Sequence, residues 1–273
     1  MWRCPKLKLT NENYHSDEAN KKYLSVSQYK NFVGTLGRPA CEAEAIALLE
    51  GKWKFDDKTT PLLVGSYVDA HFEETLATFK AQNPEIFTQK GELKAAYKQA
   101  EEIINRVERD EYFMKFMSGK KQVIMTANLF GVDFEIKIDS YLEDVAIVDL
   151  KVMQSLTKMF WSRDFGYMDF IQYWGYDIQG AVYQEVVYQN TGKRSPFYIA
   201  GVSKEKPEPN IEIIHIDDQH LKEKLIEVEQ NTPKIVMLKK GEVKPIRCEQ
   251  CDYCKHTKVL TKPIHFSELI GEV

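Results

Sequence analysis

A chain of 273 residues can bury one large hydrophobic core, since domains typically span about 100–200 residues, and we expect a single domain over residues 1–273. Hydrophobic residues make up 43% and charged residues 29%, which excludes extensive disorder, and the net charge of −4 does not indicate a strongly basic nucleic-acid-binding surface. The opening residues lack the apolar core of a secretory signal, and no run approaches the roughly 18 apolar residues of a membrane span, so we expect a cytoplasmic protein without membrane association.

The first half of the chain is predicted to be mainly helical. Helices are predicted over 25–32 and over the Ala-rich stretch 40–50, with Gly51 as a stop signal for the second. Another helix is expected to begin near Pro61. The segment from 91 to about 117 is predicted to be one long amphipathic helix with a charged, solvated face.

The pattern changes to strands after Lys120. We predict strands over 121–129, 133–139 and 145–152, and the short polar segment 140–144 would join the last two as a hairpin. The third strand is apolar on both faces except for two charged residues, which is typical of a central strand covered on both sides.

The second half of the chain alternates helices and strands. A helix is predicted from 168 to about 189, strands over 196–203 and 210–216, and a helix over 218–229. This order predicts an α/β protein, with a mixed β-sheet flanked by helices on both faces. A cysteine-containing segment, 240–260, follows.

Two charged residues, Asp149 and Lys151, interrupt the apolar central strand, and burying charge there is costly. Side chains at i and i+2 of a strand share a face, and the predicted hairpin brings Asp139 within about two residue rises of Asp149. Carboxylates are ligands that magnesium prefers, and a lysine beside them can position water or stabilise negative charge in phosphodiester hydrolysis. The alternative is a structural ion pair, because a D-x-K pattern by itself recurs by chance.

The hairpin with Asp139 and Asp149-Leu150-Lys151 resembles the active site of PD-(D/E)xK nucleases, which implies a restriction-endonuclease-like fold. Two further elements, Gly65…His71 and Gln179…Tyr183, are similar to helix motifs of the RecB-type branch of that superfamily, so that the core motifs fall within 61–216.

The resemblance also implies a role for each of these residues. It implies Mg2+ or Mn2+ bound by His71, Asp139, Asp149 and the Leu150 carbonyl. Lys151 would act on the attacking water, whereas Gln179 and Tyr183 would orient DNA or the lysine. Other interpretations remain open: His71 as a half-buried histidine, and the Gln179 and Tyr183 face as helix packing. We assign no role to Asp69 and Glu73, which are near His71 in sequence.

The cysteines Cys248, Cys251 and Cys254 are clustered, which in a reducing compartment indicates metal binding rather than disulfides. Together with Cys41 they resemble the one-plus-three layout of an iron–sulfur site found in some RecB-type nucleases. That layout implies a 4Fe–4S cluster, and four thiolates could equally hold structural zinc. The short gap between the last two cysteines departs from the iron–sulfur pattern. The alternative is four reduced cysteines without metal.

Three short segments, Asn13-Tyr14-His15, Ser25-Val-Ser27 and Cys251-Asp-Tyr-Cys254, look most like the exonuclease VIII (RecE-like) proteins of phages and prophages. This resemblance implies an exodeoxyribonuclease that resects linear double-stranded DNA ends for recombination, with a single-strand annealing protein as partner and a homo-oligomeric assembly. The alternatives are an endonuclease or single-strand nuclease on the same scaffold, and a non-catalytic DNA-binding protein whose cysteines hold zinc.

Overall fold

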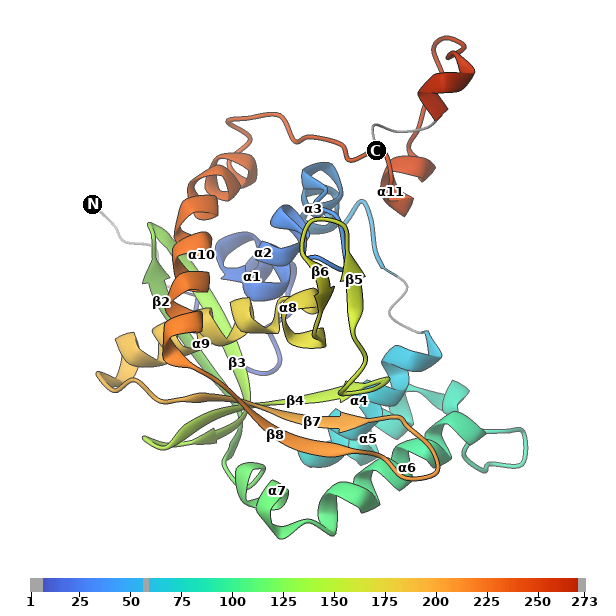
Figure 1. Ribbon diagram of the computed structural model, residues 1–273, viewed down its shortest axis with the longest axis vertical. Coiled ribbons are helices and arrows are strands. Elements are labelled where there is room, and N and C mark those ends of the chain that lie inside the picture. The colour runs from blue at the N-terminus through green and yellow to red at the C-terminus, as the bar shows by residue number, and fades with distance from the viewer. Residues whose placement is uncertain (1–6, 56–58, 270–273) are drawn as a thin grey trace.

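The computed structural model describes residues 7–55 and 59–269 (Figure 1). The opening residues 1–6, on which the prediction about a secretory signal partly rests, lie outside these ranges. The described strands include a mixed sheet in the order β1-β3-β4-β7-β8, in which β2 also pairs with β3. The sheet strands are β1 (Leu24–Ser25), β2 (Lys120–Leu129), β3 (Val132–Leu142), β4 (Ala146–Met153), β7 (Phe197–Ser203) and β8 (Ile211–Ile216).

The β3–β4 hairpin is confirmed, with a tighter connection than the sequence predicted. Antiparallel pairs run from Ser140↔Val148 to Leu142↔Ala146, so that β3 continues into the segment predicted as a loop. The turn is closed by Asp144, which adopts a positive φ of 62°. An aspartate tolerates this left-handed conformation better than most residues do.

The sheet divides on one side of β3. β2 pairs with almost the whole length of β3 on its other edge. On the shared edge, β4 pairs only with the end of β3, whereas β1 pairs in parallel with its beginning, at Phe134 and Glu135. Beyond the Ser140↔Val148 pair, β4 remains paired, among the described strands, only on its other edge, where it runs along β7 as far as Met153. An opening therefore forms between β3 and β4 at Asp139 and Asp149.

Helices cover both faces of the sheet (Figure 1). On one face, alternate strand residues such as Ile138, Ile147 and Ile199 pack with residues of α2 (Val26–Val33), α9 (Tyr176–Thr191) and α10 (Asp218–Lys239). On the other face, Val148 and Leu150 pack with α4 (Thr60–Phe72) and α6 (Ala95–Glu108). This two-sided burial confirms the predicted fold class and the central position of β4.

Three predicted helices differ from the observed ones. The segment 91–117 is broken, because Asp110 caps α7 (Glu111–Phe116) by accepting from the Phe113 N–H. The segment 168–189 divides at Gly175, whose φ of 63° ends α8 (Phe170–Trp174) before α9 begins. The last helix continues to Lys239, beyond the predicted residue 229, with Pro233 in its interior.

The remaining elements are short. They are α1 (Asp17–Lys22), α3 (Glu42–Leu49), α5 (Leu76–Gln82), α11 (Asp252–His256), the 3-10 helices η1 (Pro84–Ile86) and η2 (Phe266–Leu269), and the hairpin strands β5 (Phe160–Ser162) and β6 (Gly166–Met168). None of the helices in the described ranges is long and apolar enough to cross a membrane.

Candidate active site

The two predicted acidic residues of the hairpin meet at the opening between β3 and β4. Continuing the register from Ser140↔Val148 places Asp139 opposite Asp149. The Leu150 N–H donates to Asp139 Oδ2 at 2.9 Å. Because the N–H and carbonyl of one strand residue point to the same side, the Leu150 carbonyl also faces this opening. The structure thus brings together Asp139, Asp149 and Leu150, as the sequence predicted.

Lys151 lies on the same side of β4 as Asp149 and forms an ion pair with its Oδ2. The Lys151 ammonium group also lies 4.9 Å from the ring centroid of Tyr176, a residue that the sequence did not single out. Burial, the largest single effect, lowers the pKa of Lys151, but Asp149, Tyr176 and Asp139 together outweigh it and raise the pKa above its ordinary value. The lysine is therefore a fixed positive charge at neutral pH.

Helix α9 reaches the opening with the predicted pair Gln179 and Tyr183. Gln179 Nε2 donates to Asp149 Oδ1 at 2.6 Å, and the Tyr183 hydroxyl donates to the Lys137 carbonyl at 3.1 Å. The i, i+4 spacing places both side chains on one helix face. Gln179 therefore fixes the orientation of the Asp149 carboxylate, while Tyr183 holds the backbone of β3 beside it.

Helix α4 contributes different residues from the one expected. Asp69 lies close to the carboxyl groups of Asp139 and Asp149. Burial, followed by the nearby charge of Asp139, raises the pKa of Asp69 well above the usual range. Glu73, one helical turn later, accepts from Gln122 Nε2 at 2.8 Å, and the same amide lies 3.4 Å from Asp139 Oδ1.

The structure does not bring His71 to this group, which corrects the predicted placement. Its Nε2 lies 2.8 Å from Glu108 Oε1 on α6. Residues two apart on a helix differ in direction by about 200°, so His71 and Asp69 necessarily point to opposite sides of α4. The rotation of α4 about its own axis decides which of the two residues faces the site, and the sequence did not predict that rotation to within one residue. In the structure, Asp69 faces the site.

The site holds more negative than positive charge. The carboxyl groups of Asp69, Glu73, Asp139 and Asp149 lie together at the opening, and burial together with the Asp149 charge raises the pKa of Asp139 to about 7. A divalent cation would relieve this repulsion, and carboxylates with one backbone carbonyl are hard oxygen ligands of the kind that Mg2+ and Mn2+ accept. The residues present therefore fit a divalent metal.

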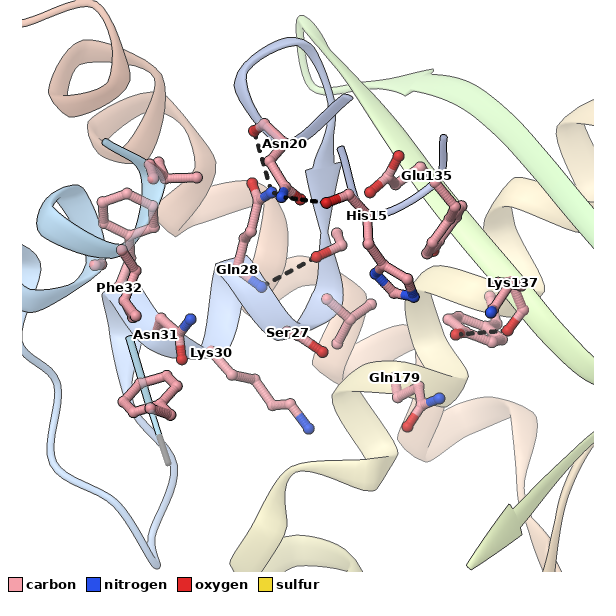
Figure 2. A pocket seen from close by; sticks show the side chains of 18 of the residues that line it. His15, Asn20, Ser27, Gln28, Lys30, Asn31, Phe32, Glu135, Lys137 and Gln179 are labelled. Atoms are coloured by element: carbon pink, nitrogen blue, oxygen red, sulfur yellow. Dashed lines mark hydrogen bonds between the residues drawn. The ribbon is translucent and has the colours of Figure 1, made fainter. Parts of the chain in front are cut away.

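A pocket of about 530 Å³ opens beside Lys151 and is lined by residues of α2, β3 and α9 (Figure 2). Figure 2 shows Lys30, His15 and Gln179 turned toward the same space. Lys30 Nζ donates to the Trp174 carbonyl at 3.2 Å, and burial together with the charge of Lys151 lowers its pKa to about 8. Lys137 also lines the pocket, which gives this side of the site a positive character.

The four predicted cysteines form a second candidate metal site. The sulfur atoms of Cys41, Cys248, Cys251 and Cys254 all lie within 4.8 Å of one another, with Cys41 and Cys254 3.6 Å apart. Burial alone would raise the pKa of Cys248, but N–H donation from Gln250 and Cys251 lowers it to about 7. Converging sulfurs that accept backbone hydrogen bonds fit thiolate ligands of a metal.

Comparisons with known proteins agree with this geometry. A model of the family described as "PDDEXK-like domain of unknown function (DUF3799)" matches residues 25–257. Among solved structures, the chain is similar to a protein from Eubacterium rectale described as a "Putative exonuclease". The two sequences are 60% identical over 98% of this chain and 100% of that chain, with a TM-score of 0.94. A search of the curated proteins gives no match.

Proposed function

Because the chain belongs to the family of PDDEXK-like domains, we propose that it is a metal-dependent exonuclease that hydrolyses phosphodiester bonds of linear double-stranded DNA. The observation that carries the proposal is the meeting of Asp139, Asp149 and Lys151 at the opening between β3 and β4. The similar E. rectale protein, described as a "Putative exonuclease", supports the choice of this activity.

Each side chain of the site then has a chemical task. A bound Mg2+ or Mn2+ would polarise the scissile phosphate and acidify the attacking water. Asp69, Asp139, Asp149 and the Leu150 carbonyl are the groups that would hold the metal. Gln179 donates to Oδ1 of Asp149, and Lys151 pairs with the other oxygen, Oδ2, so that both oxygens of this carboxylate have fixed positions.

Lys151 serves this chemistry as a cation rather than as a base. Its ammonium group is paired with Asp149 at the opening, where it would orient water and stabilise the negative charge that develops on the phosphate. The pocket on the α2 side offers Lys30 and Lys137 as further cations for the DNA backbone. This local positive surface reconciles DNA binding with a net charge of −4.

The biological setting is part of the proposal. The resemblance of the sequence to exonuclease VIII supports end resection in phage-type recombination, together with a single-strand annealing partner and a homo-oligomeric assembly. These features are carried by the resemblance rather than by a contact in the structure.

For the cysteine site we propose structural zinc. Four Zn–S bonds of about 2.3 Å in a tetrahedron place the sulfurs about 3.8 Å apart. The Cys41–Cys254 and Cys248–Cys254 sulfur distances are 3.6 and 3.9 Å. A 4Fe–4S cluster holds its four thiolates on four different iron atoms and therefore further apart.

The nuclease proposal is tested with end-labelled linear duplex, single-stranded DNA and closed-circular duplex, each with Mg2+ and with EDTA. We expect the wild-type protein to degrade linear duplex only, and EDTA, Asp149→Ala or Lys151→Ala to abolish degradation. Lys222→Ala, on the exposed surface of α10, is the matched control and keeps full activity. The position of the label reveals the polarity.

Two outcomes would replace the proposal. Cleavage of closed circles would establish an endonuclease on the same scaffold. Absence of cleavage with both Mg2+ and Mn2+, combined with DNA binding, would leave a non-catalytic DNA-binding protein.

A further inference from the structure

The β5–β6 hairpin presents large aromatic side chains to solvent. Trp161 and Tyr167 are direct cross-strand partners, so their rings lie side by side on one face of the two-stranded ribbon. Their exposed fractions are 62% and 71%, and Phe165 in the turn is 64% exposed. Soluble proteins seldom gather exposed aromatic residues in this way without a partner that covers them.

The opposite face of the hairpin anchors it to the protein. Phe160 stacks on Tyr173 of α8, with ring centroids 4.4 Å apart and an interplanar angle of 17°. Phe160 also contacts Trp174 edge to face at 6.0 Å. At the base of the hairpin, Asp169 caps α8 by accepting from the Ile171 N–H at 2.8 Å. The outward face is therefore held in a fixed direction.

The hairpin is connected directly to the candidate active site. Residues 154–159 link it to β4, the strand that carries Asp149 and Lys151 (Figure 1). At its other end, α8 leads through Gly175 to Tyr176, whose ring lies against Lys151. Both ends of the hairpin are thus joined to segments that carry residues of the candidate active site.

The charge of the hairpin fits nucleic acid. Lys158 at its base and Arg163 in its turn are exposed, as is Asp164 beside Arg163, which leaves one net positive charge over residues 158–168. Within the described ranges Arg163 forms no ion pair, and Lys158 lies 5.3 Å from the Phe160 ring centroid. Aromatic platforms bordered by cations are the general means by which proteins hold single-stranded DNA, because bases stack on the rings while the cations meet phosphates.

We propose that the Trp161–Tyr167 face stacks on unpaired bases of the DNA strand that enters the active site. The inference rests on the proposed nuclease function and specifies its substrate contact: the unpaired bases at the frayed end of a duplex, next to the scissile bond. The cationic pocket holds the backbone, while the hairpin holds the bases.

The test measures binding of a labelled single-stranded oligonucleotide in an Asp149→Asn background, which separates binding from cleavage. We expect Kd to rise about 10-fold for each ring removed by Trp161→Ala and Tyr167→Ala. Trp161→Phe with Tyr167→Phe keeps aromatic faces and retains near-wild-type Kd. Tyr112→Ala removes a ring of similar exposure, 64%, from α7 and serves as the matched control.

Two further measurements distinguish base stacking from phosphate binding and from damage to the active site. An abasic oligonucleotide offers phosphates without bases. The Asp149→Asn protein should therefore bind it as weakly as the same protein that also carries Trp161→Ala and Tyr167→Ala, called the double-alanine variant. Cleavage of the small substrate bis(p-nitrophenyl) phosphate should be equal in the wild-type protein and in the Trp161→Ala, Tyr167→Ala double variant, both with Asp149 intact. Light scattering of the same samples reports the oligomeric state.

The outcomes separate this inference from the nuclease proposal. If the protein cuts DNA but the double-alanine variant binds single strands normally, only the hairpin proposal is overturned. If hairpin-dependent binding is observed without any cleavage, the hairpin proposal stands and the nuclease proposal is lost. A change of oligomeric state in the double-alanine variant would assign the face to a second copy of this chain and overturn the proposal.

Discussion

Asp69 and His71 on α4 provide a direct comparison of two candidate metal ligands. Asp69 faces the carboxyl groups of Asp139 and Asp149, whereas His71 pairs with Glu108 on α6. We therefore expect Asp69→Ala to lower kcat/KM on linear duplex by at least about 100-fold and to raise the Mg2+ concentration needed for activity. His71→Ala should stay within about threefold of wild type, because it removes an interaction outside the site. A larger loss for His71→Ala than for Asp69→Ala would restore the histidine as the ligand.

The raised pKa of Asp139 predicts how the stability of the metal-free protein depends on pH. Because the folded-state pKa, about 7, lies above the ordinary value of 3.8, the folded protein holds a proton that the unfolded chain has released. The free energy of unfolding therefore decreases as pH rises from about 4 through 7. Magnesium requires the ionised carboxylate, so its stabilising effect should be larger at pH 8 than at pH 5.5.

Thermal unfolding at the two pH values, with and without Mg2+, checks this prediction. Asp139→Asn cannot ionise, and it should reduce both the pH dependence without metal and the gain in Tm from Mg2+ at pH 8. Equal pH dependence in the wild-type and Asn proteins would show that Asp139 does not carry the shifted proton.

At the scale of elements, two glycines in helices near the site should respond oppositely to alanine. A Cβ on Gly180 of α9 would lie 2.7 Å from the Phe197 ring of β7 and 3.0 Å from Leu221, so the helix must move away from the sheet. Overpacking of this kind costs roughly 1–3 kcal/mol of unfolding free energy. Gly65 of α4 has open space, so Gly65→Ala should stabilise by about 0.5–1 kcal/mol through helix propensity.

Urea unfolding of the two variants measures both effects. Gly180→Ala should also reduce cleavage, since moving α9 separates Gln179 from Asp149. Equal stability of the two variants would mean that the α9–β7 contact can relax without cost.

How far the sequence predicts these elements depends on the range of the interactions that form them. The alternation of apolar and polar residues predicted the strands, and the Asp149–Lys151 pair within an apolar strand predicted the site of the hairpin. Both patterns lie within a few consecutive residues and can therefore be recognised in the sequence. The side of α4 that faces the site was not predictable, since Asp69 and His71 are both polar and only tertiary packing fixes the helix phase. Lys30 lies on α2, far in sequence from Lys151, so its position beside the site was not predictable either. The strands of the β5–β6 hairpin are too short to show an alternation of apolar and polar residues.

At the scale of the whole molecule, the cysteine cluster joins the two ends of the described chain. Cys41 begins α3, Cys254 lies in α11, and 213 positions separate them. Neighbouring contacts support the junction: the Ala43 N–H donates to the Ile246 carbonyl at 3.0 Å. Trp53 packs against Tyr253 at 5.7 Å between ring centroids. The C-terminal segment is thereby held against α3, which packs beside the α2 wall of the pocket.

Removing the metal from this cluster should therefore destabilise the fold without changing the catalytic residues. A link that closes so long a loop stabilises mainly by restricting the unfolded chain, and its loss through Cys254→Ser should cost on the order of 3–5 kcal/mol. Elemental analysis is expected to find one zinc per wild-type chain and almost none in Cys254→Ser. Cys4→Ser, at a position outside the described residues, should keep its zinc. Iron together with visible absorbance near 400 nm would instead identify an iron–sulfur cluster. Full stability of the metal-free Cys254→Ser protein would show that the packing around Trp53 holds the C-terminal segment without a metal.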